Sequence, residues 1–148
     1  MQKINCQSKE LSHSYLKEAE NIFFKNPQKA DKYFDMAISL NPNDFYIWYK
    51  KGKIFFLHGK NKKEKKYIYI AIKNFKKAIS LNANYKIWVY LAKSLSLLED
   101  ITKNDMYLEQ SIEKYIKSIK YIDKKDIFIL SKIYFEYAKN ILQTAKSL

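Results

Sequence analysis

The chain has 148 residues and a formal net charge of +13, and it contains one cysteine, two glycines and two prolines. A chain of this length folds as one domain with a core of its own, and few helix breakers among abundant Lys, Leu, Ile and Ala favour helices. The single Cys6 excludes an intrachain disulfide framework and a cysteine-rich metal site, and two glycines exclude a glycine-rich phosphate loop.

Apolar residues spaced three and four apart predict seven helices. Their approximate ranges are residues 9–25, 27–40, 45–59, 61–81, 85–99, 104–122 and 126–147. Asn26 and Pro27 open the second helix as an N-cap followed by proline at the first helical position, and Asp44 caps the third. We expect the third helix to end near Gly59 and the fourth to open at Asn61, with Glu64 as its capping-box partner.

An internal repeat organises these helices. The segment from Tyr33 to Asn43 returns 41 residues later as Asn74 to Asn84, and a weaker third copy centred on Tyr115 follows after another 40 residues. The repeats cover about residues 9–43, 44–84 and 85–125, and the last helix, about residues 126–147, is expected to cap the stack. The sequence therefore predicts one domain, residues 1–148.

The repeated positions resemble the tetratricopeptide pattern over about residues 11–125. The second repeat supplies Trp48, Gly52, Phe55, Gly59, Ala71, Phe75 and Ala78. The first supplies Ala19, Ala30, Phe34, Ala37 and Pro42, and the third Trp88, Ala92, Leu95, Ser111, Tyr115 and Ser118. The family repeat has about 34 residues, whereas the repeats of this chain recur after 41 and 40 residues. The residues in excess of the family length fall near 59–66 and 100–108.

The resemblance implies an all-α, right-handed superhelical stack of antiparallel helix pairs that binds a peptide or helix of another protein in its concave groove. The groove residues that it implies are Tyr46, Tyr49, Lys50, Lys53, Phe56, Lys86, Val89, Tyr90, Lys93, Leu130 and Tyr134. Tyrosines and lysines suit a partner that is acidic and carries apolar anchors. We expect an adaptor or chaperone-like scaffold, with no catalytic residues and no cofactor.

The charge itself leaves two interpretations open. All 28 basic residues are lysines, as in a gene that favours AT-rich codons, so the charge can reflect drift. Alternatively, a basic outer face binds nucleic acid nonspecifically through phosphate contacts. The residues of that alternative are Lys62, Lys63, Lys65, Lys66, Lys73, Lys76 and Lys77.

Two further expectations concern metals and location. Glu99, Asp100, Asp105, Glu109 and Glu113 are acidic without a histidine, which favours helix caps and a solvated face over a metal site. Residues 1–12 lack the apolar run of a signal peptide, and no segment has the roughly 18 apolar residues of a membrane span. The sequence thus predicts a cytoplasmic protein.

Overall fold

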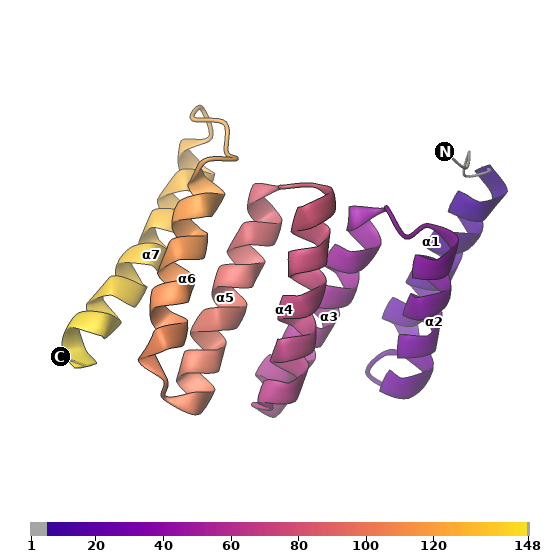
Figure 1. Ribbon diagram of the computed structural model, residues 1–148, viewed down its shortest axis with the longest axis horizontal. Helices are drawn as coiled ribbons and strands as arrows, with labels where there is room; N and C mark the ends of the chain where they lie inside the picture. Colours follow the sequence, from indigo (N-terminus) through magenta and orange to yellow (C-terminus); the bar gives the residue numbers. More distant parts are fainter. Residues whose placement is uncertain (1–5, 148) are drawn as a thin grey trace.

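The computed structural model describes residues 6–147, and every regular element in that range is an α-helix, which confirms the all-α prediction. The seven helices are α1 (Cys6–Ile22), α2 (Pro27–Leu40), α3 (Phe45–Lys62), α4 (Lys65–Leu81), α5 (Tyr85–Thr102), α6 (Asp105–Ile119) and α7 (Ile127–Ser147). Figure 1 shows them side by side in chain order, with α1 and α7 at opposite ends. None of these helices combines the length and the apolarity needed to cross a membrane.

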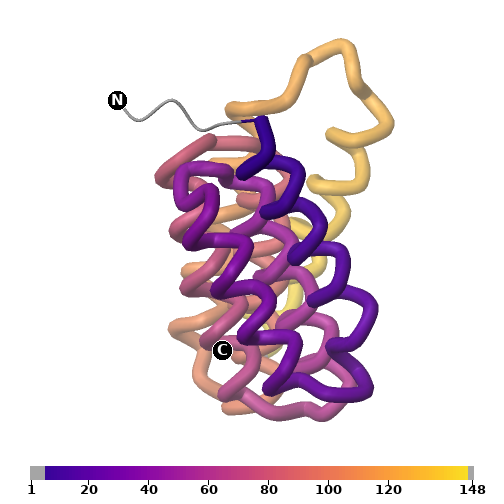
Figure 2. The backbone as a smooth tube through the Cα atoms, turned by 90° about the vertical axis from the view of Figure 1, so that its right-hand side faces the viewer, coloured from indigo at the N-terminus to yellow at the C-terminus, as the bar shows by residue number. Residues whose placement is uncertain are grey.

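Helices next to each other in the chain pack against each other. The closest partners are α1 with α2, α3 with α4 and α5 with α6, each an antiparallel pair joined by a short turn (Figure 1). Helix α7 packs mainly on α6 and follows a longer connection, residues 120–126, which protrudes beyond the helix ends in Figures 1 and 2.

Side-chain caps explain where four of the helices begin. Asn26, Asp44, Asn84 and Asn104 each accept a hydrogen bond, 2.9–3.1 Å long, from a backbone N–H two or three residues later. Each bond satisfies a donor that the first helical turn leaves without a partner. The predicted caps Asn26 and Asp44 are thereby confirmed, together with the proline at the first position of α2.

The predicted turn at Gly59 and the capping box at Asn61 are wrong. Helix α3 continues through both residues to Lys62, and Glu64 precedes α4 without making a side-chain cap bond. Gly59 instead permits the close approach of α4, because a Cβ atom there would collide with the side chain of Ile68. The chain turns at Lys63, whose φ of 54° lies in the left-handed region and whose N–H bonds to the Gly59 carbonyl.

The same turn recurs 40 residues later. Lys103 has a φ of 56°, and its N–H donates to the Glu99 carbonyl at 2.7 Å. The extra residues of the two long repeats therefore lengthen α3 and α5 to 18 residues each rather than forming long loops.

The repeated positions occupy equivalent places in the core. In each even-numbered helix, a small residue, an aromatic ring and a second small residue are at most 1% exposed. These residues are Ala30, Phe34, Ala37, Ala71, Phe75, Ala78, Ser111, Tyr115 and Ser118. On α3, Gly52 gives the Phe75 ring its space, since a Cβ atom at Gly52 would lie 2.6 Å from Phe75 Cε1.

The core consists of two clusters of different size. The larger cluster runs from α1 to α5, whereas the smaller joins α5, α6 and α7 through Ala92, Tyr115, Ile122 and Ile133. Buried polar contacts reinforce the smaller one: the Ser111 hydroxyl donates to the Ala92 carbonyl at 2.8 Å, and Asn140 Nδ2 donates to the Ser111 oxygen at 2.9 Å. Helix α7 is thus held by fewer core residues than the other helices.

Candidate functional site

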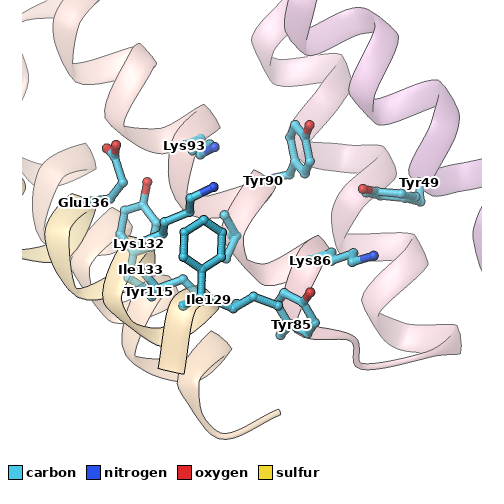
Figure 3. A pocket seen from close by; sticks show the side chains of 12 residues that line it. Tyr49, Tyr85, Lys86, Tyr90, Lys93, Tyr115, Ile129, Lys132, Ile133 and Glu136 are labelled. Atoms are coloured by element: carbon cyan, nitrogen blue, oxygen red, sulfur yellow. The ribbon is translucent and has the colours of Figure 1, made fainter. Parts of the chain in front are cut away.

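A cleft runs along α5 between α3 and α7, and it consists of two adjoining hollows. The first has a volume of about 350 Å³ and is shown in Figure 3, where Tyr49 of α3 and Tyr90 of α5 face Ile129 and Ile133 of α7. The second, of about 440 Å³, lies between Phe56 of α3 and Lys139 of α7. Both hollows are lined by Tyr90, Lys93, Tyr115 and Glu136, so they lie next to each other along α5, and we call them together the cleft.

Tyr90 is the centre of the cleft's aromatic floor. Its ring lies 5.8 Å from Tyr49, 5.8 Å from Phe56 and 5.7 Å from Phe75, measured between ring centroids. Because Phe75 is fully buried, the core of the second repeat supports this floor directly.

Lysine ammonium groups lie above these rings. Lys53 Nζ is 5.3 Å from the Tyr49 centroid and 5.2 Å from that of Tyr90, and Lys93 Nζ is 5.6 Å from Tyr90. At these distances the negative ring faces attract the cations and help to hold them at the cleft surface.

Burial raises the pKa of the Tyr49 hydroxyl to about 12, and the nearby Tyr90, Tyr46 and Tyr85 add smaller contributions. Burial also raises the pKa of Tyr115. Both phenols therefore stay neutral around pH 7.

The two hollows differ in character. The first is walled by tyrosines and by the apolar Val89, Phe128, Ile129 and Ile133, with Lys86, Lys93 and Lys132 as its cations and Glu136 as its anion. The second contains the charged residues Lys60, Lys93, Lys139, Asp100 and Glu136. Positive charges exceed negative ones in both, so the cleft offers an apolar surface together with attraction for carboxylates.

The structure brings most of the expected groove residues of α3 and α5 together. Tyr49, Lys86, Val89, Tyr90 and Lys93 line the first hollow, and Phe56 lines the second. Lys53 lies over the tyrosines of the floor.

The other four expected groove residues lie outside the lining of both hollows. Lys50 forms an ion pair with Glu20 at 2.5 Å, and its ammonium group lies 5.6 Å from the ring of the exposed Tyr46. The Glu20 bond raises the pKa of Lys50, so it stays charged and paired. Leu130 packs against the smaller core cluster, and Tyr134 is 51% exposed.

The α7 residues that line the cleft were not among the expected ones. They are Phe128, Ile129, Lys132, Ile133, Glu136 and Lys139. Transferring the repeat spacing onto α7 selects Leu130 and Tyr134 instead, although the residues in the lining also recur on one helical face. The amphipathic pattern of α7 itself was the signal that could have found them.

The lysines of the alternative basic patch divide into two groups. Lys62, Lys63, Lys65 and Lys66 surround the turn between α3 and α4, where Lys66 pairs with Glu64 at 2.7 Å. The others are exposed along α4, and Lys73 and Lys77 border a hollow that also contains Asp31 and Asp35. Carboxylates thus lie beside both groups.

Among residues 6–147, no group of three His, Cys, Asp or Glu side chains is arranged to hold a metal ion. The expectation of a solvated face is wrong for Glu99, which is only 6% exposed. It accepts a hydrogen bond from Gln143 Nε2 at 2.6 Å and so joins α5 to α7. Burial, and to a lesser extent the charge of Asp100, raises the pKa of Glu99, whereas Lys103 opposes the rise.

We expect Glu99→Gln to raise the melting temperature at about pH 7, with the gain vanishing toward about pH 4. A carboxyl whose pKa is higher in the folded chain stabilises the fold below its unfolded pKa, and this contribution is lost as the pH rises through the folded pKa. Glutamine remains neutral and keeps an acceptor for Gln143. Thermal unfolding followed by circular dichroism at both pH values tests this, and an equal gain at both would contradict the titration of Glu99 as the cause.

The comparisons with known proteins do not assign the chain to a family. No protein-family model matches it, and neither does any curated protein.

Proposed function

We propose that the protein is a non-enzymatic interaction module of the tetratricopeptide kind, a right-handed superhelical stack that acts as an adaptor or chaperone-like scaffold. In this proposal the cleft over α5 binds a peptide or helix of another protein. The observation that carries it is a pair of adjacent hollows, one mainly apolar and aromatic and the other with more charged residues.

The chemistry of the two hollows specifies the ligand. An apolar side chain of the bound segment packs against Tyr49, Tyr85 and Tyr90, in the hollow that aromatic and aliphatic groups wall. Carboxylates of the same segment fit near Lys60, Lys93 and Lys139. The segment is therefore acidic with at least one large apolar anchor.

The repeat pattern supports the architectural part of the proposal. The small and aromatic positions that the resemblance selects are buried in α2, α4 and α6, and the first helices of the pairs, α3 and α5, contribute to the cleft. This is the division of roles that the tetratricopeptide resemblance implies.

We expect Lys53→Glu with Lys93→Glu to weaken partner binding about tenfold or more. Each reversal replaces an attraction of up to about 1 kcal/mol by a repulsion of similar size, and about 1.4 kcal/mol is a factor of ten. The measurement is a pull-down from nuclease-treated lysate of the source cell, followed by calorimetric titration of the retained protein.

The matched control reverses two lysines of the alternative basic patch, Lys62→Glu with Lys65→Glu. Both are exposed, and the change in net charge is the same. Two results would contradict the cleft as the site and favour nucleic-acid binding. In one, the partner is retained by the cleft variant but lost by the control, and in the other, nuclease treatment abolishes its retention.

A further inference from the structure

Helix α7 carries an exposed apolar face, most of which lies outside the cleft over α5. The large side chains on it are Ile127, Phe128, Tyr134, Phe135, Ile141 and Leu142, which are 41–74% exposed. The small residues Ser131, Ala138 and Ala145 recur between them at intervals of seven residues. We call these nine positions the outer stripe. Phe128 also lines the first cleft hollow, and Ser131 and Phe135 border a neighbouring hollow with Lys93 of α5.

The outer stripe is separate from the surface that docks α7. The docking side contains Ile133, which is 4% exposed, and Asn140, which is 2% exposed. At 100° per residue, Ala138 lies on nearly the opposite side of the helix from both. In Figure 1 no further helix lies beyond α7, so within residues 6–147 nothing covers the stripe.

The stripe is large enough to matter energetically. If a fully exposed large side chain presents about 150–250 Å², the six large members together expose roughly 550–900 Å² at their exposed fractions. This reaches the upper end for the largest apolar patch on a monomer, about 300–600 Å². It is also comparable to the roughly 800 Å² that each partner buries in a stable complex.

Charge distinguishes the two edges of the stripe. Lys132, Lys139 and Lys146 follow one edge at intervals of seven residues, and all three are exposed. Lys132 Nζ lies 4.2 Å from the Phe128 ring centroid, at the border of the apolar surface. The opposite edge carries Leu130, Tyr137 and Thr144, which have no charge.

This asymmetry argues against a second copy of the chain as the occupant. Two α7 helices paired antiparallel about a two-fold axis bring the same edges together, so that lysines face lysines. A parallel pair places each lysine edge against an uncharged edge and gains no ion pairs. The net charge of +13 adds a general repulsion between copies.

We propose that the outer stripe of α7 binds an amphipathic helix of a partner protein that carries Asp or Glu along one edge of its apolar face. The acidic edge lies against Lys132, Lys139 and Lys146. Ser131, Ala138 and Ala145 let the bound helix approach closely between the large side chains. The lysine edge of the outer stripe borders the cleft over α5, because Lys132 and Lys139 also line the cleft hollows, whereas Tyr134, Ala138 and Leu142 lie outside both hollows.

The test uses two fluorescein-labelled helical peptides of about 18 residues, or five turns, with leucine at the a and d positions. One carries glutamate along both flanks of the leucine stripe, and the other carries lysine at the same places. Fluorescence anisotropy measures their binding to the full chain, to Ala138→Glu with Leu142→Glu, and to the matched control Gln28→Glu with Met36→Glu. The control adds the same charge on exposed positions of α2.

We expect the glutamate peptide to bind at least tenfold more tightly than the lysine peptide, to lose at least tenfold in affinity with the α7 variant, and to bind the control unchanged. The cleft variant Lys53→Glu, on α3 over Tyr49 and Tyr90, should retain binding. Equal affinity for the native chain and the α7 variant would overturn the proposal, as would loss of binding in the cleft variant. A native dimer in light scattering that the α7 variant converts to monomer would assign the stripe to a second copy instead. Circular dichroism verifies that every variant is folded.

Discussion

Replacing Phe75 with alanine should lower the free energy of unfolding by about 3–5 kcal/mol, the usual cost of deleting a buried aromatic ring. Phe75 is fully buried, and its ring occupies the space left by Gly52 on the neighbouring helix. It also lies 6.3 Å from Tyr49 and 5.7 Å from Tyr90, so the cavity would open directly beneath the cleft floor. Urea unfolding followed by circular dichroism measures the change.

The matched control is Phe135→Ala, the same chemical deletion at a side chain that is 68% exposed on α7. We expect it to change stability by less than about 1 kcal/mol. Similar losses for the two variants would contradict the view that the repeated aromatic position carries the core. Because the Phe75 cavity loosens the support of Tyr90, binding in the cleft should also weaken in a preparation that is still folded.

The periodic part of the fold follows from the sequence because the same short pattern recurs where helices approach each other. Ala71 and Ala78 leave space beside Phe75, and the equivalent positions of α2 and α6 do the same at intervals of 41 and 40 residues. Burial and spacing therefore identify these positions together. The start of α2 follows as well, since Asn26 and Pro27 have a local stereochemical role.

Helix ends were harder to predict where a residue has two uses. Gly59 suggested a turn because glycine often ends helices, but here it sits inside α3 and makes room for Ile68. Only the position of α4 distinguishes the two roles. Lys63 forms the turn in a left-handed conformation, which is uncommon for residues other than glycine and asparagine. A turn at this lysine was therefore not predicted.

The candidate cleft likewise has one part that the repeat spacing predicts and one part that it does not. Six of the residues that the repeat spacing selects on α3 and α5 line it, because these two helices each belong to a packed pair, whereas Tyr46 and Lys50 of α3 lie outside it. Helix α7 has no following helix within the described residues, and its rotation is set by Ile133, Asn140 and Gln143 rather than by the repeat. The spacing accordingly selected Leu130 and Tyr134, while Lys132 and Glu136 line the cleft.

Ile133→Ala should weaken the docking of α7 by about 2–5 kcal/mol, the range for an aliphatic core truncation. Ile133 is 4% exposed and belongs to the smaller cluster, whose other buried members within residues 6–147 are Ala92, Tyr115 and Ile122. Native-state hydrogen exchange should show faster exchange in Ile127–Ser147 and little change in α1 to α4, whose core is the larger cluster. The control Ile141→Ala removes the same atoms from a side chain that is 41% exposed and should leave exchange nearly unaltered.

Ile133→Ala also distinguishes two effects on ligand affinity, namely the loss of α7 docking and the loss of a direct contact with the ligand. If α7 forms one wall of the binding site, the apparent affinity of a cleft ligand falls only in proportion to the fraction of molecules in which α7 is docked. A loss of docking free energy that leaves α7 mostly docked thus alters exchange strongly and binding hardly at all. Binding falls steeply only when a second truncation, such as Ile129→Ala, brings the docked and undocked populations close to each other. A proportional loss of affinity after the first truncation would instead mean that Ile133 itself contacts the ligand.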